Sequence, residues 1–231
     1  MKKFRKYRME MVMACLLLVS FYLLSRQAAV VSVQMNFPKL ILIDPGHGED
    51  DPGMIGADGL EEKGINLAIS LLLKSELETR GYSVVMTRET DKGLYDASAN
   101  NKKAQDMQRR IAMIGEKSPV LSVSIHQNSY PDPAIKGAQV FYYTSSVEGK
   151  QLAKRLQERL VKGLDPQNHR QAKANDSYYL LKKTACPIVI VECGFLSNPQ
   201  EEALLTDSVY QERVAWNIFM GIMQELKMKK E

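Results

Sequence analysis

Two of the three histidines in this chain stand directly behind short apolar runs. His47 follows LILIDPG, His126 follows VLSVSI, and Glu192 follows IVIV in the same way. Two adjacent acids, Glu61 and Glu62, come between the first apolar run and a helical pattern. Two imidazoles and one carboxylate suit Zn²⁺ and leave a position open for water, while a further carboxylate can move protons. These residues therefore indicate a metallohydrolase that acts on an amide, and spacing alone leaves the choice between Glu61 and Glu62 open.

The elements that must position these residues alternate between strand-like and helix-like patterns. Strands are expected over residues 40–43, 83–87, 120–125, 139–143, 178–181 and 188–191. Helices are expected over 63–80, 107–116, 147–163 and 208–228, and Asn198-Pro199-x-Glu201 has the pattern of a helix start. The alternation predicts a single-domain α/β protein, with a mixed, mostly parallel sheet between helices on both faces in three layers. Ligands of such sheets bind beyond the carboxyl ends of the strands, where both histidines fall.

The residues around His47 favour a tight turn at a bound group. Pro45-Gly46 turns the chain, and Gly48 allows the backbone to pass close to a ligand. Asp44 can accept a hydrogen bond from the free N–H of His47 and so fix its tautomer. A simple turn acid before proline is an equal alternative for Asp44.

Charge is unevenly distributed along the 231 residues, whose net charge is +4. Residues 1–26 hold six basic residues and one acid, so the rest of the chain has no basic surplus and nothing favours nucleic-acid binding. The basic flank and the apolar run MVMACLLLVSFYLL predict a signal peptide or uncleaved signal anchor over residues 1–25, with a buried N-terminal helix as the alternative. After this segment we expect a tether over residues 26–38 and a catalytic domain over residues 39–231. Export would place this domain outside the cytoplasmic membrane, with the N-terminal segment as its only membrane contact.

The cysteine pattern does not indicate a disulfide framework. Cys186 and Cys193 bracket a predicted strand, which separates them by roughly 23 Å, much farther than a disulfide spans. Cys193 follows Glu192 directly, so alternation along the strand points its side chain the other way, into the core.

Seven segments, in order, resemble the zinc-dependent N-acetylmuramoyl-L-alanine amidases with a type-3 catalytic domain. They are IDPGHG, EKGINLAIS, VVMTR, RRIAMI, SVSIHQNS, KGAQVFYY and IVECGFLSNPQE. The resemblance covers about residues 39–227 and implies the phosphorylase/hydrolase-like fold of zinc amidases. By this resemblance, His47, Glu62 and His126 match the Zn²⁺ ligands and Glu192 matches the catalytic glutamate. Glu62 is matched rather than Glu61 because it directly precedes Lys63 and the NLA stretch.

The resemblance implies hydrolysis of the amide between N-acetylmuramic acid and L-alanine, with peptidoglycan glycan strands bearing stem peptides as substrate. The single domain and the short connection over residues 144–147 look most like the spore cortex, germination-specific amidases of endospore formers. There, peptide removal is the first step toward the muramic-δ-lactam of spore cortex, so the resemblance implies a location in the forespore/cortex space. A regulatory protein partner fits a site without a built-in inhibitor. The alternatives are a vegetative wall-turnover amidase, a non-catalytic zinc-containing peptidoglycan-binding module, and a zinc peptidase or deacylase.

Overall fold

The computed structural model describes residues 7, 10–23, 39–56 and 58–228, in two compact units that divide after Pro38. In the first unit, residues 10–23 form a helix. Within the described residues, no helix is both long enough and apolar enough to cross a membrane. The predicted tether, residues 26–38, lies outside the described residues, and the signal segment stays a prediction.

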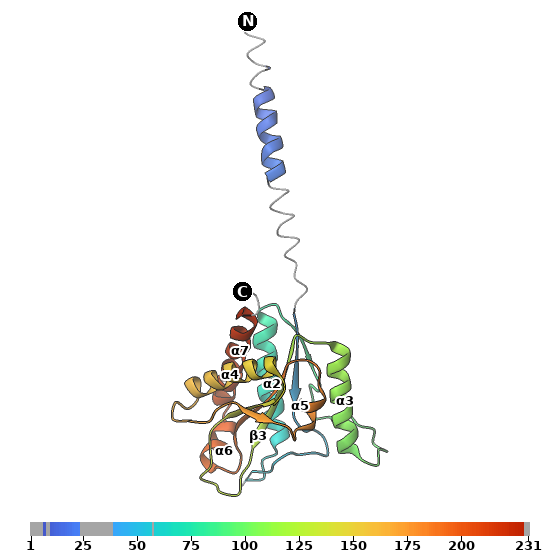
Figure 1. The fold of residues 1–231 in the computed structure, drawn as a ribbon, viewed down its shortest axis with the longest axis vertical. Coiled ribbons are helices and arrows are strands. Elements are labelled where there is room, and N and C mark those ends of the chain that lie inside the picture. Colours follow the sequence, from blue (N-terminus) through green and yellow to red (C-terminus); the bar gives the residue numbers. More distant parts are fainter. Residues whose placement is uncertain (1–6, 8–9, 24–38, 57, 229–231) are drawn as a thin grey trace. The chain divides into compact units, whose positions relative to one another are not determined.

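The second unit is built on a six-stranded sheet with the order β2-β1-β3-β6-β4-β5 (Figure 1). Its strands are β1 (Leu40–Pro45), β2 (Ser83–Met86), β3 (Leu121–Asn128), β4 (Gln139–Tyr143), β5 (Lys173–Asn175) and β6 (Ile188–Phe195). The pairs β1–β2, β1–β3, β3–β6 and β4–β5 are parallel, and β4 runs antiparallel to β6. The predicted mixed, mostly parallel sheet is therefore confirmed.

Helices cover both faces of this sheet. One face carries α2 (Glu62–Thr79), α4 (Val147–Gly163) and α7 (Ser208–Met228), with α7 packed against the other two. The other face carries α3 (Lys102–Lys117) and α5 (Tyr179–Lys183), which contact each other. Figure 1 shows α2, α4 and α7 grouped on one side of the strands and α3 on the other. The predicted three-layer α/β class is confirmed.

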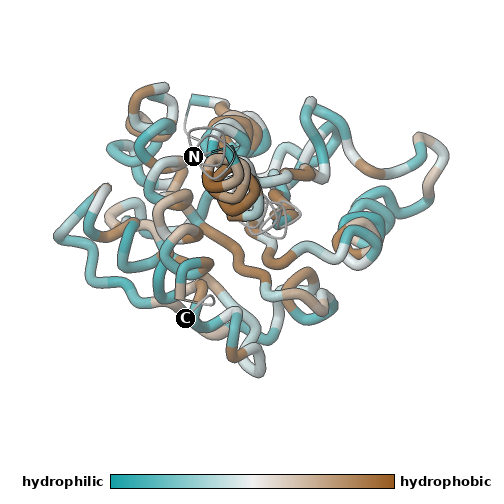
Figure 2. Tube along the Cα trace, turned by 90° about the horizontal axis from the view of Figure 1, so that it is seen from above, coloured by the Kyte–Doolittle hydropathy of each residue, from teal (hydrophilic) through white to brown (hydrophobic). Residues whose placement is uncertain are grey.

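The core lies on both faces of the sheet because successive apolar residues of the central strands point to opposite sides. Ile41 and Ile43 of β1 pack with α2, α4 and α7, while Leu42 between them joins the cluster on the α3 side. Figure 2 shows brown stretches within the second unit between helices and loops whose outer turns are mostly teal. Full burial of a side chain such as Leu73 or Leu77 contributes roughly 1.5–3 kcal/mol, so the helix stripes hold the layers together.

One predicted strand is wrong: residues 178–181 lead into the short helix α5. Leu180 and Leu181 both pack in the cluster on the α3 side. Successive residues of a strand would point to opposite faces, so a helix is the conformation that buries both leucines together. The strand β5 was not anticipated because it has only three residues, which are largely exposed and show no apolar run.

The predicted helix start at Asn198 is confirmed. The Asn198 side-chain oxygen accepts hydrogen bonds from the backbone N–H groups of Gln200 and Glu201, both at 3.0 Å, and Pro199 opens α6 (Pro199–Thr206). These bonds satisfy N–H groups that have no partner inside the helix.

Candidate metal centre

Three neighbouring strands place polar side chains in one row. In the register of the sheet, His126 of β3 lies opposite Glu192 of β6, which in turn lies opposite Gln139 of β4. Directly paired residues share a face, so all three side chains stand on the α3–α5 side. His47 follows β1, the strand next to β3, and Glu62 is the first residue of α2. The carboxyl edge of the sheet therefore collects the residues that the sequence singled out.

The side chains of His47, Glu62 and His126 converge on one point. His47 Nε2 lies 3.2 Å from Glu62 Oε2, and His126 Nδ1 lies 3.1 Å from Glu62 Oε1. One ligand atom of each residue lies within 4.8 Å of the other two. Bonds of ~2.0–2.2 Å at a tetrahedral ion place two ligand atoms about 3.4 Å apart. The spacing and the two-imidazole, one-carboxylate donor set both fit a divalent ion such as Zn²⁺.

Glu62, rather than Glu61, reaches this cluster. Glu61 is exposed at the start of α2 and pairs with Lys63 at 3.2 Å. Glu62 is buried, and backbone N–H groups of Met54 and Gln127 donate to its carboxylate at 2.8 and 2.9 Å. These bonds hold the carboxylate in one orientation before any ion binds.

The electrostatics of the cluster match a site for a cation. Burial lowers the pKa of His47, but hydrogen bonds and charges from Asp51 and Glu62 outweigh it and raise that pKa to about 9. Burial raises the pKa of Glu62, but the two histidines hold it far below its usual range. The proton on His47 supplies positive charge beside the buried Glu62 carboxylate, and a bound divalent ion can take its place.

Asp51 fixes His47, and Asp44 does not. His47 Nδ1 lies 2.8 Å from Asp51 Oδ2, which leaves Nε2 toward Glu62. The tautomer role considered for Asp44 is therefore wrong, as is the simple turn role. Asp44 is buried and accepts a hydrogen bond at 2.6 Å from Arg110. The sequence offers acids three residues before and four residues after His47, and this spacing does not choose between them.

Two arginines, which the sequence reasoning left without a role, hold the backbone that leads to His47. Arg110 donates to the carbonyl oxygens of Pro45 at 2.8 Å and His47 at 2.7 Å. Arg88 donates to Pro45 at 3.1 Å and to Gly46 at 2.9 Å. His47 itself has φ of 63°, in the left-handed region that costs a non-glycine residue of order 1 kcal/mol or more. The arginine bonds stabilise this strained turn.

Glycine is required at Gly46 because the backbone touches an imidazole. A Cβ there would lie 2.2 Å from Cε1 of His126. Gly48 has φ of 140°, and a Cβ there would lie 2.8 Å from the carbonyl oxygen of Lys92. The close approach expected at Gly48 is therefore made to another loop of this chain.

Glu192 faces the same cavity as the two histidines. It is only 7% exposed, and no described residue hydrogen-bonds its Oε2. Burial raises its pKa to about 7, and a hydrogen bond from Tyr178 opposes the shift. Burial and the nearby charge of Glu192 raise the pKa of Tyr178 to about 12. A buried carboxyl with a free oxygen is suited to receive and release a proton.

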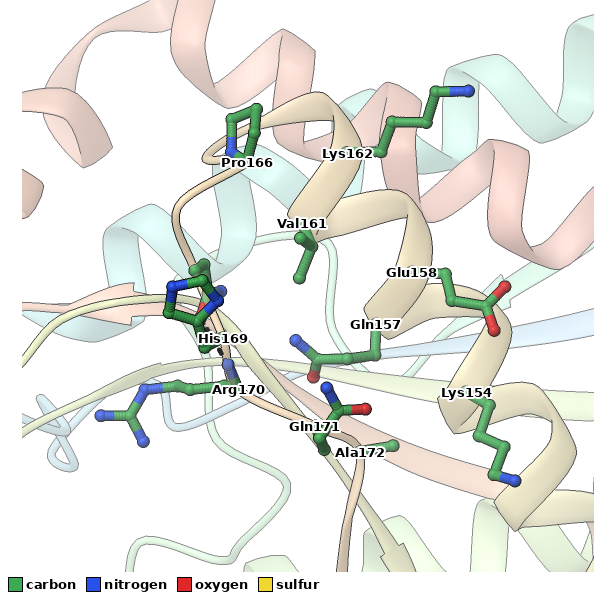
Figure 3. Close-up of a pocket in the computed structure, with 11 residues that line it drawn as sticks. Lys154, Gln157, Glu158, Val161, Lys162, Pro166, His169, Arg170, Gln171 and Ala172 are labelled. Carbon is green, nitrogen blue, oxygen red and sulfur yellow. Dashed lines mark hydrogen bonds between the residues drawn. The ribbon is translucent and has the colours of Figure 1, made fainter.

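The other sequence features lie outside this cavity. Cys193 is buried in the core on the α2 side and does not pair with Cys186, as predicted. His169 is exposed on the loop after α4, where it lines a separate cavity of about 600 Å³ (Figure 3).

Two histidines and a glutamate at the carboxyl edge of an α/β sheet, beside a buried free carboxyl, define a candidate metal-dependent hydrolase. Residues 41–224 match the family described as N-acetylmuramoyl-L-alanine amidase, and the chain belongs to this family. The prediction of the family is confirmed.

Individual relatives and solved structures that the chain resembles are also amidases. The chain is 36% identical over 189 residues to the germination-specific N-acetylmuramoyl-L-alanine amidase of Bacillus subtilis, covering 80% of this chain and 79% of that protein. A solved structure of the CwlD amidase from Clostridioides difficile, in complex with the GerS lipoprotein, is 41% identical with a TM-score of 0.80. That match covers 82% of this chain and 99% of the other. The amidase AmiC2 of Nostoc punctiforme is 29% identical with a TM-score of 0.72, over 82% of this chain and 97% of its own.

Proposed function

We propose that this protein is a zinc-dependent amidase that hydrolyses the bond between N-acetylmuramic acid and L-alanine in peptidoglycan. The observation that carries the proposal is the convergence of His47, Glu62 and His126 beside the free carboxyl oxygen of Glu192. Family membership over residues 41–224 supports the substrate class.

His47 Nε2, His126 Nδ1 and the Glu62 carboxylate would hold the ion. Two imidazoles favour Zn²⁺ over the harder cations Mg²⁺ and Ca²⁺, which prefer oxygen ligands. When bound, Zn²⁺ supplies polarisation of the scissile carbonyl and a lower pKa for water. Asp51 fixes the His47 ring, and the arginine bonds to the His47 turn keep it in place.

Glu192 moves the protons of the reaction. Its Oε2 takes a proton from the attacking water and delivers it to the nitrogen of L-alanine as the C–N bond breaks. The leaving amine is therefore neutral, and the carboxylate is regenerated. A pKa of about 7, raised by burial, lets this carboxyl hold and release a proton at neutral pH.

We assign the activity to spore cortex, outside the cytoplasmic membrane. The support is the likeness to an amidase named germination-specific and to one solved in complex with a lipoprotein. By the same likeness, a lipoprotein is the kind of regulatory partner we propose. The N-terminal segment would be the only part of the chain that meets the membrane.

The experiment compares the wild-type chain with Glu192→Gln and His126→Ala on purified cortex and vegetative peptidoglycan. Wild type should release stem peptides that begin with L-alanine, identified by mass spectrometry, and faster from cortex. Glu192→Gln should keep its zinc, measured by elemental analysis, and lose about 10²–10⁴-fold in rate. His126→Ala should lose zinc.

Each part of the proposal can fail separately. Turnover by Glu192→Gln at the wild-type rate would remove Glu192 as the proton carrier. Full zinc occupancy in His126→Ala would remove His126 from the ligand set. Bound zinc without peptide release from either material would favour a non-catalytic module, and equal rates on both materials would favour general wall turnover.

A further inference from the structure

The cavity at Glu192 has one lining residue, Tyr178, in common with a second groove that carries only positive charge. This basic groove has a volume of about 450 Å³ and is lined, among others, by Asn128, Gln139, Arg170, Lys173, Tyr178 and Phe195. Tyr178 also lines the cavity that holds Glu192 and both histidines, so the two spaces share a wall. A ligand that passes the Tyr178 side chain from the reacting amide would enter the basic groove.

The register of the sheet confirms how close this groove lies to Glu192. Gln139 of β4 is the direct cross-strand neighbour of Glu192. Residues paired in this way have Cβ atoms ~4.5–5.5 Å apart on the same face. Gln139 thus links the wall of the basic groove to the proton carrier of the proposed reaction.

Three contacts fix the orientation of the Arg170 guanidinium in this groove. Its Nε donates to the carbonyl oxygen of Lys136 at 2.8 Å, and its Nη1 donates to Gln139 Oε1 at 3.3 Å. The guanidinium also lies over the ring of Phe195, 4.7 Å from its centroid. Arg170 also lines the cavity beside α4, and Figure 3 shows its guanidinium directed away from that helix. Nη2 takes part in neither hydrogen bond, so the guanidinium is oriented but can still bind a ligand.

The charge of the groove has one sign. Arg170 and Lys173 line it, and no Asp or Glu is among its lining residues. On the opposite side of the site, a groove along α3 is mainly apolar, with Met107 and Tyr179 in its wall and Lys103 as its only charged residue. The two ends of the site therefore favour different parts of a substrate.

We propose that the basic groove is the subsite for carboxylates of the stem peptide beyond L-alanine, with Arg170 as the main ligand and Lys173 at the rim. This assignment rests on the proposed amidase function. A stem peptide carries carboxylates past its first residue, whereas the sugar on the other side of the amide is uncharged. Guanidinium groups match carboxylates in geometry and charge. The peptide therefore leaves the reacting amide on the β4–β5 side.

The test uses two muramoyl-tetrapeptides that differ only in having free carboxylates or primary amides beyond L-alanine. Their affinity is measured by calorimetry on zinc-loaded Glu192→Gln, so binding is read without turnover. We expect the carboxylate form to bind about tenfold more tightly, the scale of one hydrogen bond between charged partners. Adding Arg170→Gln should abolish this difference and leave affinity for the amidated form unchanged.

Controls separate charge from folding. Lys150→Gln removes an exposed lysine of α4 that does not line the groove and should keep the tenfold preference. Arg170→Lys keeps the positive charge but loses the planar pair of guanidinium donors, so it should retain part of the preference for the carboxylate peptide. Equal affinity for both peptides in Glu192→Gln, or a full preference that survives Arg170→Gln, would overturn the subsite.

The kinetic arm distinguishes this proposal from the proposed function. With Glu192 intact, kcat/KM should favour the carboxylate substrate about tenfold, mostly through KM, and Arg170→Gln should remove the preference. If neither peptide is cleaved yet the binding preference follows Arg170, the amidase function fails and the subsite stands. If both are cleaved equally and bound equally, the subsite fails and the function stands.

Discussion

Replacing Asp44 tests whether its buried ion pair with Arg110 stabilises the turn that carries His47. The Asp44 carboxylate is 1% exposed and accepts hydrogen bonds at 2.6 Å from Arg110, Thr87 and Ser124. Asp44→Asn keeps the shape and some of these bonds but removes the charge that faces the buried guanidinium. Arg110 keeps Asp106 as its remaining anionic partner.

The size of the effect follows from the pKa of Asp44. Burial raises this pKa, but Arg110 and the hydroxyl bonds outweigh it and lower it from 3.8 to about 2. At about 1.36 kcal/mol per pKa unit, the ionised form stabilises the fold by about 2 kcal/mol. Removing one partner of a buried pair altogether costs ~3–5 kcal/mol. We therefore expect a loss of about 2–3 kcal/mol for Asp44→Asn and about 3–5 kcal/mol for Asp44→Ala.

The assay is urea unfolding followed by circular dichroism, at pH 7 and at steps down to pH 3. Because the folded pKa lies below 3.8, the stabilisation is complete above about pH 4 and fades as the pH falls toward 2. The gap between wild type and Asp44→Asn should therefore narrow at the acidic end. Asp96→Asn, which breaks an exposed pair with Arg109, is the matched control and should leave the midpoint unchanged.

Two results would refute this reasoning. An Asp44→Asn variant within about 0.5 kcal/mol of wild type at pH 7 would show that the charge pair is not a main support. A difference that stays constant from pH 7 to pH 3 would show that ionisation of Asp44 is not its source.

Three further predictions concern the site itself. Tyr178→Phe removes a hydrogen bond that lowers the pKa of Glu192, so this pKa should rise. The acidic limb of the pH profile of kcat/KM should therefore move to higher pH, and an unchanged profile would contradict this. Asp51→Asn should weaken zinc binding ~10–100-fold in a chelator competition, because it replaces the charged acceptor beside the imidazole ring with a neutral amide; unchanged affinity would exclude that role. Gly46→Ala should displace His126, whose ring would lie 2.2 Å from the new Cβ, and lower zinc stoichiometry measured by elemental analysis; full stoichiometry would show that the loop yields instead.

The positions of the site residues at strand ends were predictable, because the ends of strands follow from local patterns of apolar residues. Apolar runs of strand length place His47, His126 and Glu192 at one edge once the sheet is mostly parallel. The partner of His47 was not predictable in this way. Asp44 and Asp51 lie three and four residues from it, and the fold decides between them, since Asp44 accepts from the distant Arg110 and Asp51 contacts the His47 ring.

The sequence by itself determined the α/β class, the family, and which residues stand after each strand, since periodicity and short motifs depend on neighbours along the chain. Tertiary structure alone decided what those residues touch. Glu62 meets His126 across 64 positions, and Arg110 reaches Asp44 across 66. Such contacts arise from the order of strands in the sheet and from burial, which also raises the pKa of Glu192. The basic groove around Arg170 has the same origin, because its wall combines β3, β4, β5 and β6, which no short stretch of sequence brings together.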